Sequence, residues 1–190
     1  MHAKIALKEW AVVVEALASG EQLLLLRKGG IRDPRGSFDL QHREFLLYPT
    51  TEHANQEAIR PEFHSRFAGA LERREEPSQI SFHVYGGVAL ALELKEARQL
   101  SGLEKYHIWT PAFLEERLRY RPGAPACLLV IRAYRLPRAV VRPALPEYAG
   151  CISWVTLAEP VPLEGAEPVV ENRRFRAALE QISSRLEVET

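Results

Sequence analysis

The chain has 190 residues, a length typical of one domain that buries its own core. Apolar residues make up 46% and charged residues 26%, a balance that excludes intrinsic disorder and predicts a stable fold. Lys plus Arg and Asp plus Glu number 25 each, so no net charge attracts the whole chain to nucleic acid or anionic lipid. Any nucleic-acid site must therefore be a local patch, and we expect one domain over residues 1–190.

Charged residues interrupt the first twenty positions, starting with Lys4 and Lys8, which argues against a signal peptide. No apolar run approaches the roughly 20 residues that a membrane-spanning helix needs. Cys127 and Cys151 lie in apolar, strand-like runs, where Cys behaves as a small buried hydrophobe. These features predict a cytoplasmic protein with no membrane partner, no metal knuckle and no cofactor.

The first half of the chain is expected to alternate helices and short strands. Apolar residues at helical spacing predict a helix over 5–18, ended by Gly20. The apolar runs at 22–27 and 44–48 predict buried strands, the second stopped by a proline. Residues 55–74 are expected to form a polar helix or lid.

The second half begins with a predicted hairpin, in which Gly86-Gly87 is the turn between strands at 80–84 and 88–94. Thr110 is a plausible N-cap for a helix over 111–118 that opens with proline. The run at 127–136 predicts the longest strand.

A short strand over 151–157 and a closing helix over about 169–187 complete the predicted elements. The Pro-rich stretch 137–168 is expected to be coil packed on the surface. Because strict βαβ alternation is absent, the predicted fold class is α+β, with a mainly antiparallel sheet or small barrel and flanking helices.

Several short motifs together resemble the bacterial domain of unknown function 1802 family over about residues 5–157. They are Lys8-Glu9-Trp10, Arg27-Lys28-Gly29-Gly30-Ile31, Glu44-Phe45, Tyr48-Pro49-Thr50-x-x-His53, His107-Ile108-Trp109 and Cys151-x-Ser153-Trp154. The activity of that family is not established. Some members are linked with restriction-type nuclease domains, so the resemblance implies a DNA-directed setting.

A fainter similarity is to PUA-like barrels of the ASCH and EVE kind. It rests on Trp10, Gly20-Glu21-Gln22 and Leu26-Arg27-Lys28-Gly29-Gly30, in which a Trp-bearing helix leads into a strand with a basic turn. Such barrels often bind RNA or modified DNA bases in a cleft, and the similarity implies a PUA-like barrel here.

The turn Arg27-Lys28-Gly29-Gly30 has the parts of an anion site, because two cations stand beside two residues with no side chain to block approach. We predict ligand contact there. The alternative is a strand end that uses its glycines for positive φ and exposes its cations to water.

His42, Glu44 and His53 bracket the second predicted strand, and His42 and Glu44 share one face of it. They are candidate ligand-binding residues. A divalent-metal site is one hypothesis, but without tight helical spacing a hydrogen-bonded polar network is the more common outcome, so no metal is predicted.

His107, Trp109, Arg117 and Tyr120 combine rings and a cation beside a helix start, where a base can stack or a phosphate can bind. Trp154 is expected to join them. The alternative places His107 and Trp109 in the core, because tryptophan is commonly a core residue.

Glu93-Leu94-Lys95 at a strand end matches the Glu-x-Lys pair with which many nucleases hold a metal and orient water. That arrangement also needs an upstream acid, for which the candidates are Asp33, Asp39, Glu75 and Glu76.

The absence of acyl-transfer and dinucleotide-binding motifs favours a non-catalytic module that binds DNA or RNA, with recognition of modified DNA in a restriction-type system as the more specific hypothesis. The alternatives are a metal-dependent nuclease using Glu93 and Lys95, and an adaptor subunit that docks on a nuclease protein.

Overall fold

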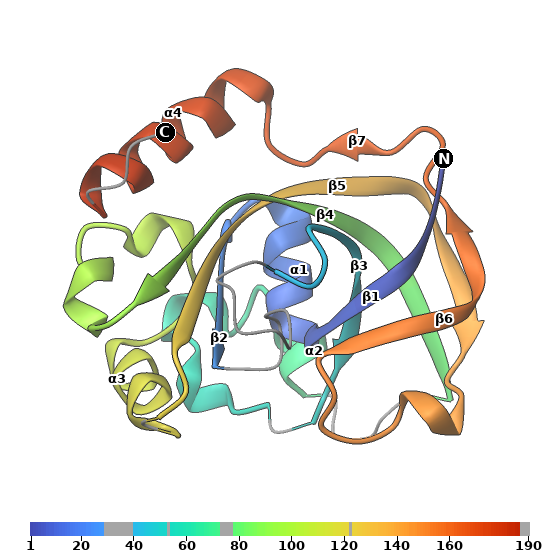
Figure 1. The fold of residues 1–190 in the computed structure, drawn as a ribbon, viewed down its shortest axis with the longest axis horizontal. Helices are drawn as coiled ribbons and strands as arrows, with labels where there is room; N and C mark the ends of the chain where they lie inside the picture. The colour runs from blue at the N-terminus through green and yellow to red at the C-terminus, as the bar shows by residue number, and fades with distance from the viewer. Residues whose placement is uncertain (29–39, 53, 73–77, 122, 187–190) are drawn as a thin grey trace.

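The computed structural model describes residues 1–28, 40–52, 54–72, 78–121 and 123–186. The described strands form one curved sheet in the order β2-β5-β4-β3-β1-β6, with β7 added beside β5 (Figure 1). Only β1 and β3 pair in parallel, so the predicted α+β class with a mainly antiparallel sheet is confirmed. None of the helices in these residues is long and apolar enough to cross a membrane.

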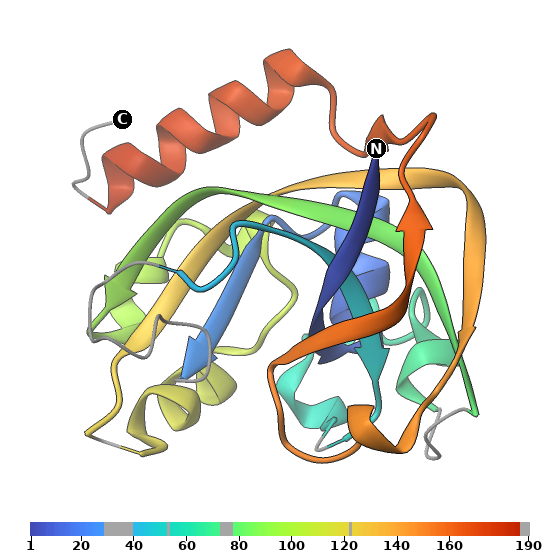
Figure 2. The same cartoon turned by 45° about the vertical axis from the view of Figure 1, so that its right-hand side comes forward.

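The strands are β1 (His2–Trp10), β2 (Leu24–Lys28), β3 (Glu44–Thr50), β4 (Gln79–Leu94), β5 (Ala126–Pro143), β6 (Trp154–Pro162) and β7 (Glu167–Pro168). The α-helices of the described residues are α1 (Ala11–Ser19), α2 (Ala68–Leu71), α3 (Pro111–Arg119) and α4 (Asn172–Arg185). Figure 2 shows α4 lying outside the sheet, at the end of the molecule away from α3.

The N-terminal helix begins later than predicted, because residues 5–10 belong to strand β1. β1 lies between two partners, with Ala6 opposite Leu46 of β3 and opposite Val155 of β6. A short apolar run is ambiguous between buried strand and helix, and the pairing on both sides decides for the strand. The predicted helix end is confirmed, since Gly20 adopts φ 79 as the C-cap of α1.

The predicted Gly86-Gly87 hairpin is wrong, because residues 79–94 form the single long strand β4, which pairs with β5 along its length. A Cβ on Gly86 would lie 3.0 Å from Cγ2 of Ile131 and 3.3 Å from Cδ2 of Leu47. The glycine therefore allows core side chains to approach the backbone, which is the other common reason for glycine within a strand.

Two further predictions need correction. Residues 55–72 form 3-10 turns at Gln56–Ala58 and Pro61–Phe63 and the short α2 rather than one helix, and residues 73 and 74 lie outside the described residues. The stretch 137–168 is largely strand, because β5 extends to Pro143 and is followed by β6 and β7. Proline is tolerated within β5 at Pro137 because the pairing with β4 is irregular there.

Residue 151 also lies outside the strand predicted for it, because β6 begins at Trp154, and Cys151 is exposed while Cys127 is buried as expected. The helix predicted over 111–118 is confirmed as α3, with the Thr110 hydroxyl accepting a hydrogen bond from the Phe113 amide. The closing helix is confirmed as α4.

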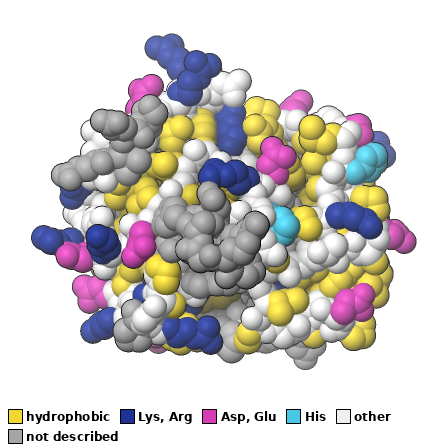
Figure 3. Space-filling model, in the orientation of Figure 1, with side chains coloured by type: hydrophobic (Ala, Val, Ile, Leu, Met, Phe, Trp, Pro, Cys, Tyr) yellow, Lys and Arg dark blue, Asp and Glu magenta, His cyan; other side chains and the backbone are white. Residues whose placement is uncertain are grey.

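The central strands β1 and β3 are buried on both faces. Leu7 and Phe45 point into the cluster that also holds α1, while Ala6 and Leu46 point into a second cluster with β6. On the face in Figure 3, basic and acidic side chains are interspersed, so the charge balance of the sequence is also seen locally there.

Candidate functional site

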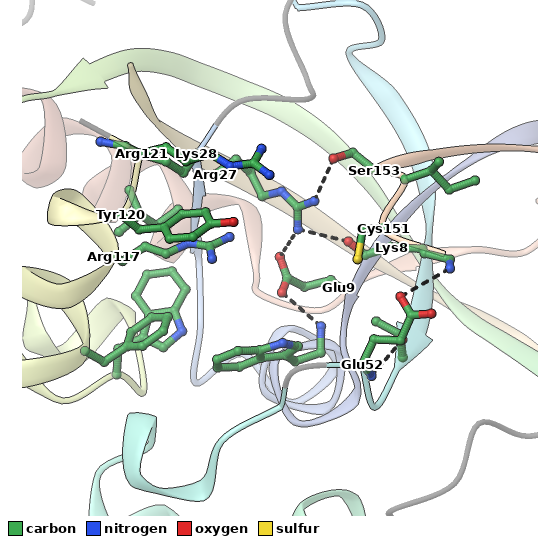
Figure 4. Close-up of a pocket in the computed structure, with 16 residues that line it drawn as sticks. Lys8, Glu9, Arg27, Lys28, Glu52, Arg117, Tyr120, Arg121, Cys151 and Ser153 are labelled. Atoms are coloured by element: carbon green, nitrogen blue, oxygen red, sulfur yellow. Dashed lines mark hydrogen bonds and ion pairs between the residues drawn. The ribbon is translucent and has the colours of Figure 1, made fainter. Parts of the chain in front are cut away.

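A pocket of about 280 Å³ opens between the ends of β1 and β2, helix α3 and the loop at 151–153 (Figure 4). Five cations and two carboxylates line it, and we call it the basic pocket. These side chains are Lys8, Arg27, Lys28, Arg117 and Arg121 with Glu9 and Glu52. The pocket therefore carries a local excess of positive charge in a chain whose formal net charge is zero.

One wall of the basic pocket is a hydrogen-bonded group around Arg27, which we call the Arg27 network. Nη1 of Arg27 donates to the Lys8 carbonyl at 3.0 Å and to Oε2 of Glu9 at 3.1 Å. Nη2 donates to Oγ of Ser153 at 3.1 Å, and Oε1 of Glu9 accepts from the Trp10 amide at 2.9 Å. The Arg27 and Glu9 side chains are only 13% and 10% exposed, so this charge pair is largely removed from water.

The Arg27 network also joins the two ends of the sheet. Arg27 lies on β2, the first strand in the sheet order, and Ser153 directly precedes β6, the last. No β2–β6 pairing is present among the described strands, so side chains make this connection where backbone hydrogen bonds do not. The predicted barrel is thus an open sheet whose ends meet through Arg27.

Lys8 is a second ion-paired cation of the same wall. Its Nζ donates to the Gly150 carbonyl at 3.0 Å and lies 3.6 Å from Oε2 of Glu52 and 5.5 Å from the Tyr48 ring centroid. The predicted site omitted Lys8 because residues 5–10 were expected to be helical, and it omitted Ser153 because residues 151–157 were expected to be a buried strand. The signal that identifies this wall is the charged pair Lys8-Glu9 at the end of an apolar run.

The opposite wall is α3, and its cation Arg117 is held differently. Arg117 is half-buried and makes no hydrogen bond or ion pair with any described residue. Its guanidinium carbon lies 5.9 Å from the centroid of the Tyr120 ring. Burial and the nearby charge of Arg27 lower the pKa of Arg117 below its usual range. Because five N–H donors are available on a guanidinium, Arg117 can bind an anion without breaking a protein contact.

Lys28 has a carbonyl partner but no carboxylate partner among the described residues. Its Nζ donates to the Leu118 carbonyl at 2.7 Å and so connects β2 to α3. The turn predicted to bind an anion therefore contributes Arg27 and Lys28 to the basic pocket, with both side chains already bonded to protein groups. Gly29 and Gly30 lie outside the described residues.

Aromatic side chains cover the floor between the two walls. Trp109 is only 3% exposed and packs on Phe113 at 6.1 Å, while Trp10 lies 5.3 Å from Phe113 on its other side. The His107 ring stacks on the Trp109 ring with a distance of 5.4 Å between the ring centroids, but His107 does not line the pocket. Burial lowers the pKa of His107 to about 4, so this imidazole is neutral at pH 7. The expected stacking role of His107 and Trp109 thus gives way to a core role, with an edge of Trp109 reaching the pocket.

Three other predicted site residues do not line the basic pocket. Trp154 packs in T-shaped contacts on His42 at 4.9 Å and on Phe45 at 5.2 Å. Burial lowers the pKa of His42. The pKa of Tyr85 is raised, chiefly by burial and in second place by a hydrogen bond with Glu44. His53 lies outside the described residues. Among the described residues, no group of three or more His, Cys, Asp or Glu is arranged to bind a metal ion.

Glu93 and Lys95 are exposed at the end of β4, in a surface hollow shared with Lys28 and Arg119. All the acids that the nuclease hypothesis requires, Asp33, Asp39, Glu75 and Glu76, lie outside the described residues. The nuclease alternative therefore stays a prediction.

Comparison with known proteins gives one family and distant structural likenesses. The family model described as "Domain of unknown function (DUF1802)" matches residues 6–181. The crystal structure of ASCH from Zymomonas mobilis is 11% identical, with a TM-score of 0.45 over 93% of this chain and 93% of that one. A variant of that protein with one serine replaced by alanine is also 11% identical, with a TM-score of 0.45 over 84% of this chain and 92% of that one. No curated protein matches.

Proposed function

The chain belongs to the domain of unknown function (DUF1802) family, and we propose that it is a nucleic-acid-binding module whose basic pocket holds a phosphate and an attached base. The observation that carries this proposal is Arg117, a half-buried guanidinium in the pocket wall with no carboxylate or carbonyl partner among the described residues. Its unpaired N–H donors are available to an anionic ligand.

The excess of cations over carboxylates in the pocket supports an anionic ligand. Glu9 offsets Arg27, and Glu52 offsets Lys8, so the two carboxylates of the wall are already paired. Lys28, Arg117 and Arg121 remain without a carboxylate partner among the described residues. All three line the pocket, and at the half-buried Arg117 salt screens an ion pair less than it does on open surface.

The chemistry of Arg117 favours phosphate over a simple anion. A guanidinium is planar and presents a fork of donors that matches two phosphate oxygens, and it remains charged at every physiological pH. The aromatic floor of Trp10 and Phe113 adds apolar surface next to that cation. Phosphate beside an aromatic surface is the pairing that nucleotides require.

The size of the pocket limits what it can hold. A volume of about 280 Å³ lies near the lower end of the range for small-molecule sites, which suits a ligand group of the size of one base. Recognition of a modified base in a restriction-type system is the narrower form of this proposal, and its support is the family resemblance together with a pocket of single-base size.

Arg117→Ala tests the proposal, with Arg119→Ala as its matched control. Arg119 lies on the same helix but is exposed, paired with Glu115 at 3.6 Å, and absent from the pocket wall. We expect Arg117→Ala to weaken binding of fluorescent DNA and RNA oligonucleotides and to reduce the slope of log affinity against log salt by about 0.7–0.9. Arg119→Ala should bind like the parent.

Equal binding by the two variants, or no binding of any oligonucleotide, would contradict a phosphate site at Arg117. A pull-down that retains a nuclease protein after nucleic-acid removal would then favour the adaptor alternative. For the narrower proposal, methylated or hydroxymethylated DNA should bind more tightly than unmodified DNA of the same sequence, and equal affinities would restrict the function to general nucleic-acid binding.

A further inference from the structure

We infer that nucleic acid reaches the basic pocket as a single strand, with an unpaired base held at the mouth between Tyr120 and Ile152. This inference rests on the proposed function and names the class of nucleic acid. It is carried by a pair of exposed apolar side chains, by two guanidiniums beside the Tyr120 ring, and by a left-handed residue at the end of α3.

Large hydrophobic side chains are rarely exposed in the described part of the chain. The four that are exposed are Met1, Tyr120, Val141 and Ile152, and two of them line the basic pocket. Tyr120, at the C-terminal end of α3, is 49% exposed, and Ile152, in the loop before β6, is 43% exposed. Single exposed hydrophobics need no explanation, but two brought from distant segments to one charged mouth form a surface suited to an apolar, flat ligand group.

The close-up shows how this mouth is arranged. Tyr120 lies beside Arg117 on one side of the pocket, and Ser153, the neighbour of Ile152 in the chain, lies on the other side (Figure 4). Ser153 accepts a hydrogen bond from Arg27 through its hydroxyl oxygen, so its own O–H remains able to donate. A base entering here would meet a ring on one side and a hydroxyl donor with an aliphatic side chain on the other.

Two guanidiniums lie beside the Tyr120 ring. The guanidinium carbon of Arg117 lies 5.9 Å from the ring centroid and that of Arg121 lies 5.2 Å from it. Arg121 is exposed and forms no side-chain hydrogen bond or ion pair with the described residues. A base can therefore displace the Arg121 guanidinium from the ring, and the displaced cation can pair with the next phosphate.

The backbone at Arg121 holds this arrangement in place. Arg121 adopts φ 46, and no other non-glycine residue of the described chain has a positive φ. Residues other than glycine rarely adopt this conformation, which is commonly found at functional positions. This backbone conformation therefore occurs at the residue whose guanidinium lies over the Tyr120 ring.

A duplex does not suit this mouth. Bases in a duplex stack on each other and their faces are not accessible, whereas every unpaired base offers a face to an aromatic ring. DNA and RNA single strands share this chemistry, so the sugar is left for experiment to decide.

The experiment compares Tyr120→Ala and Tyr120→Phe with Val141→Ala, a control at a residue equally exposed but absent from the pocket. The ligands are fluorescent oligo(dT), oligo(U) and a hairpin duplex. We expect the parent to prefer one or both single strands over the duplex. Tyr120→Ala should lose about 5- to 150-fold in single-strand affinity with little change in salt slope, and Tyr120→Phe and Val141→Ala should bind like the parent.

The inference fails if the duplex binds as tightly as the single strands, if Tyr120→Ala binds like the parent, or if Tyr120→Phe loses as much as Tyr120→Ala. In those cases a loss of binding in Arg117→Ala would leave the proposed function standing. If Arg117→Ala also binds like the parent, or nothing binds, the proposed function fails with it. Melting temperatures of the variants exclude loss of folding as the cause.

Discussion

The two walls of the basic pocket carry the same kind of side chain and use it differently. On the β-sheet wall, the Arg27 guanidinium bonds to Lys8, Glu9 and Ser153. On the α3 wall, Arg117 has no such partner among the described residues and stands next to the exposed Tyr120. The comparison teaches that an arginine lining a pocket is evidence for a ligand only when the protein leaves its donors unpaired.

The difference follows from what each wall must do for the fold. β2 and β6 are the ends of the sheet order, and Arg27 connects them through Ser153. α3 needs no help from Arg117, because the Thr110 cap and Lys28 on the Leu118 carbonyl already hold its two ends. The Arg27 side chain thus stabilises the fold, and the Arg117 side chain is available for binding a ligand.

Among the substitutions that test the difference between the two walls, Arg27→Ala should change the free energy of unfolding most. Removing the guanidinium leaves Glu9 without a partner in a largely buried place, so we expect a loss of about 3 kcal/mol in the free energy of unfolding. Urea denaturation at pH 7 measures it. A loss below about 0.5 kcal/mol would show that the Arg27 network does not stabilise the fold. A single cooperative transition of the parent would support the predicted one-domain organisation.

A smaller effect is expected from acid, through His107 behind the aromatic floor. Its pKa is about 4 in the folded chain, while the unfolded chain has the usual value near 6.5, so the unfolded state binds more protons between these values. Stability should therefore be complete above pH 6.5 and fall as the pH drops toward 4, by about 2 kcal/mol.

The measurement for His107 is the difference in unfolding free energy between the parent and His107→Leu from pH 6.5 to 4, which removes the acid response common to both. His83 does not interfere in this window. Its pKa is raised, chiefly by a hydrogen bond with Glu15, so its contribution is complete below pH 6.5 and is lost only as the pH rises. Parallel curves for the parent and His107→Leu would contradict a buried neutral His107.

The smallest expected effect is that of Arg117→Ala on stability. Because Arg117 has no partner among the described residues and its burial is only partial, we expect the free energy of unfolding to change by less than about 0.5 kcal/mol. The same denaturation series gives this value. A loss as large as that of Arg27→Ala would remove the distinction between the two walls.

Elements with local signals were predictable from the sequence. Thr110 followed by proline marked the start of α3, and Gly20 marked the end of α1, because caps act within one turn of the chain. Gly86 was wrongly predicted to be in a turn, because the sequence signal of a glycine is the same in a turn and in a strand. The two cases differ in the side chain that packs against the glycine in space. That neighbour, Ile131, is far along the chain.

The site shows the same division. The sequence by itself determined the α+β class, the family, and five residues that meet in one pocket, namely Arg27, Lys28, Trp109, Arg117 and Tyr120. Only the tertiary structure decided that β1 is a strand, that Glu9 and Ser153 bond to Arg27, and that no described residue forms a hydrogen bond or ion pair with Arg117. The physical reason is that caps and apolar periodicity are properties of neighbouring residues, whereas the partner of a charge is chosen by the packing of segments distant in sequence.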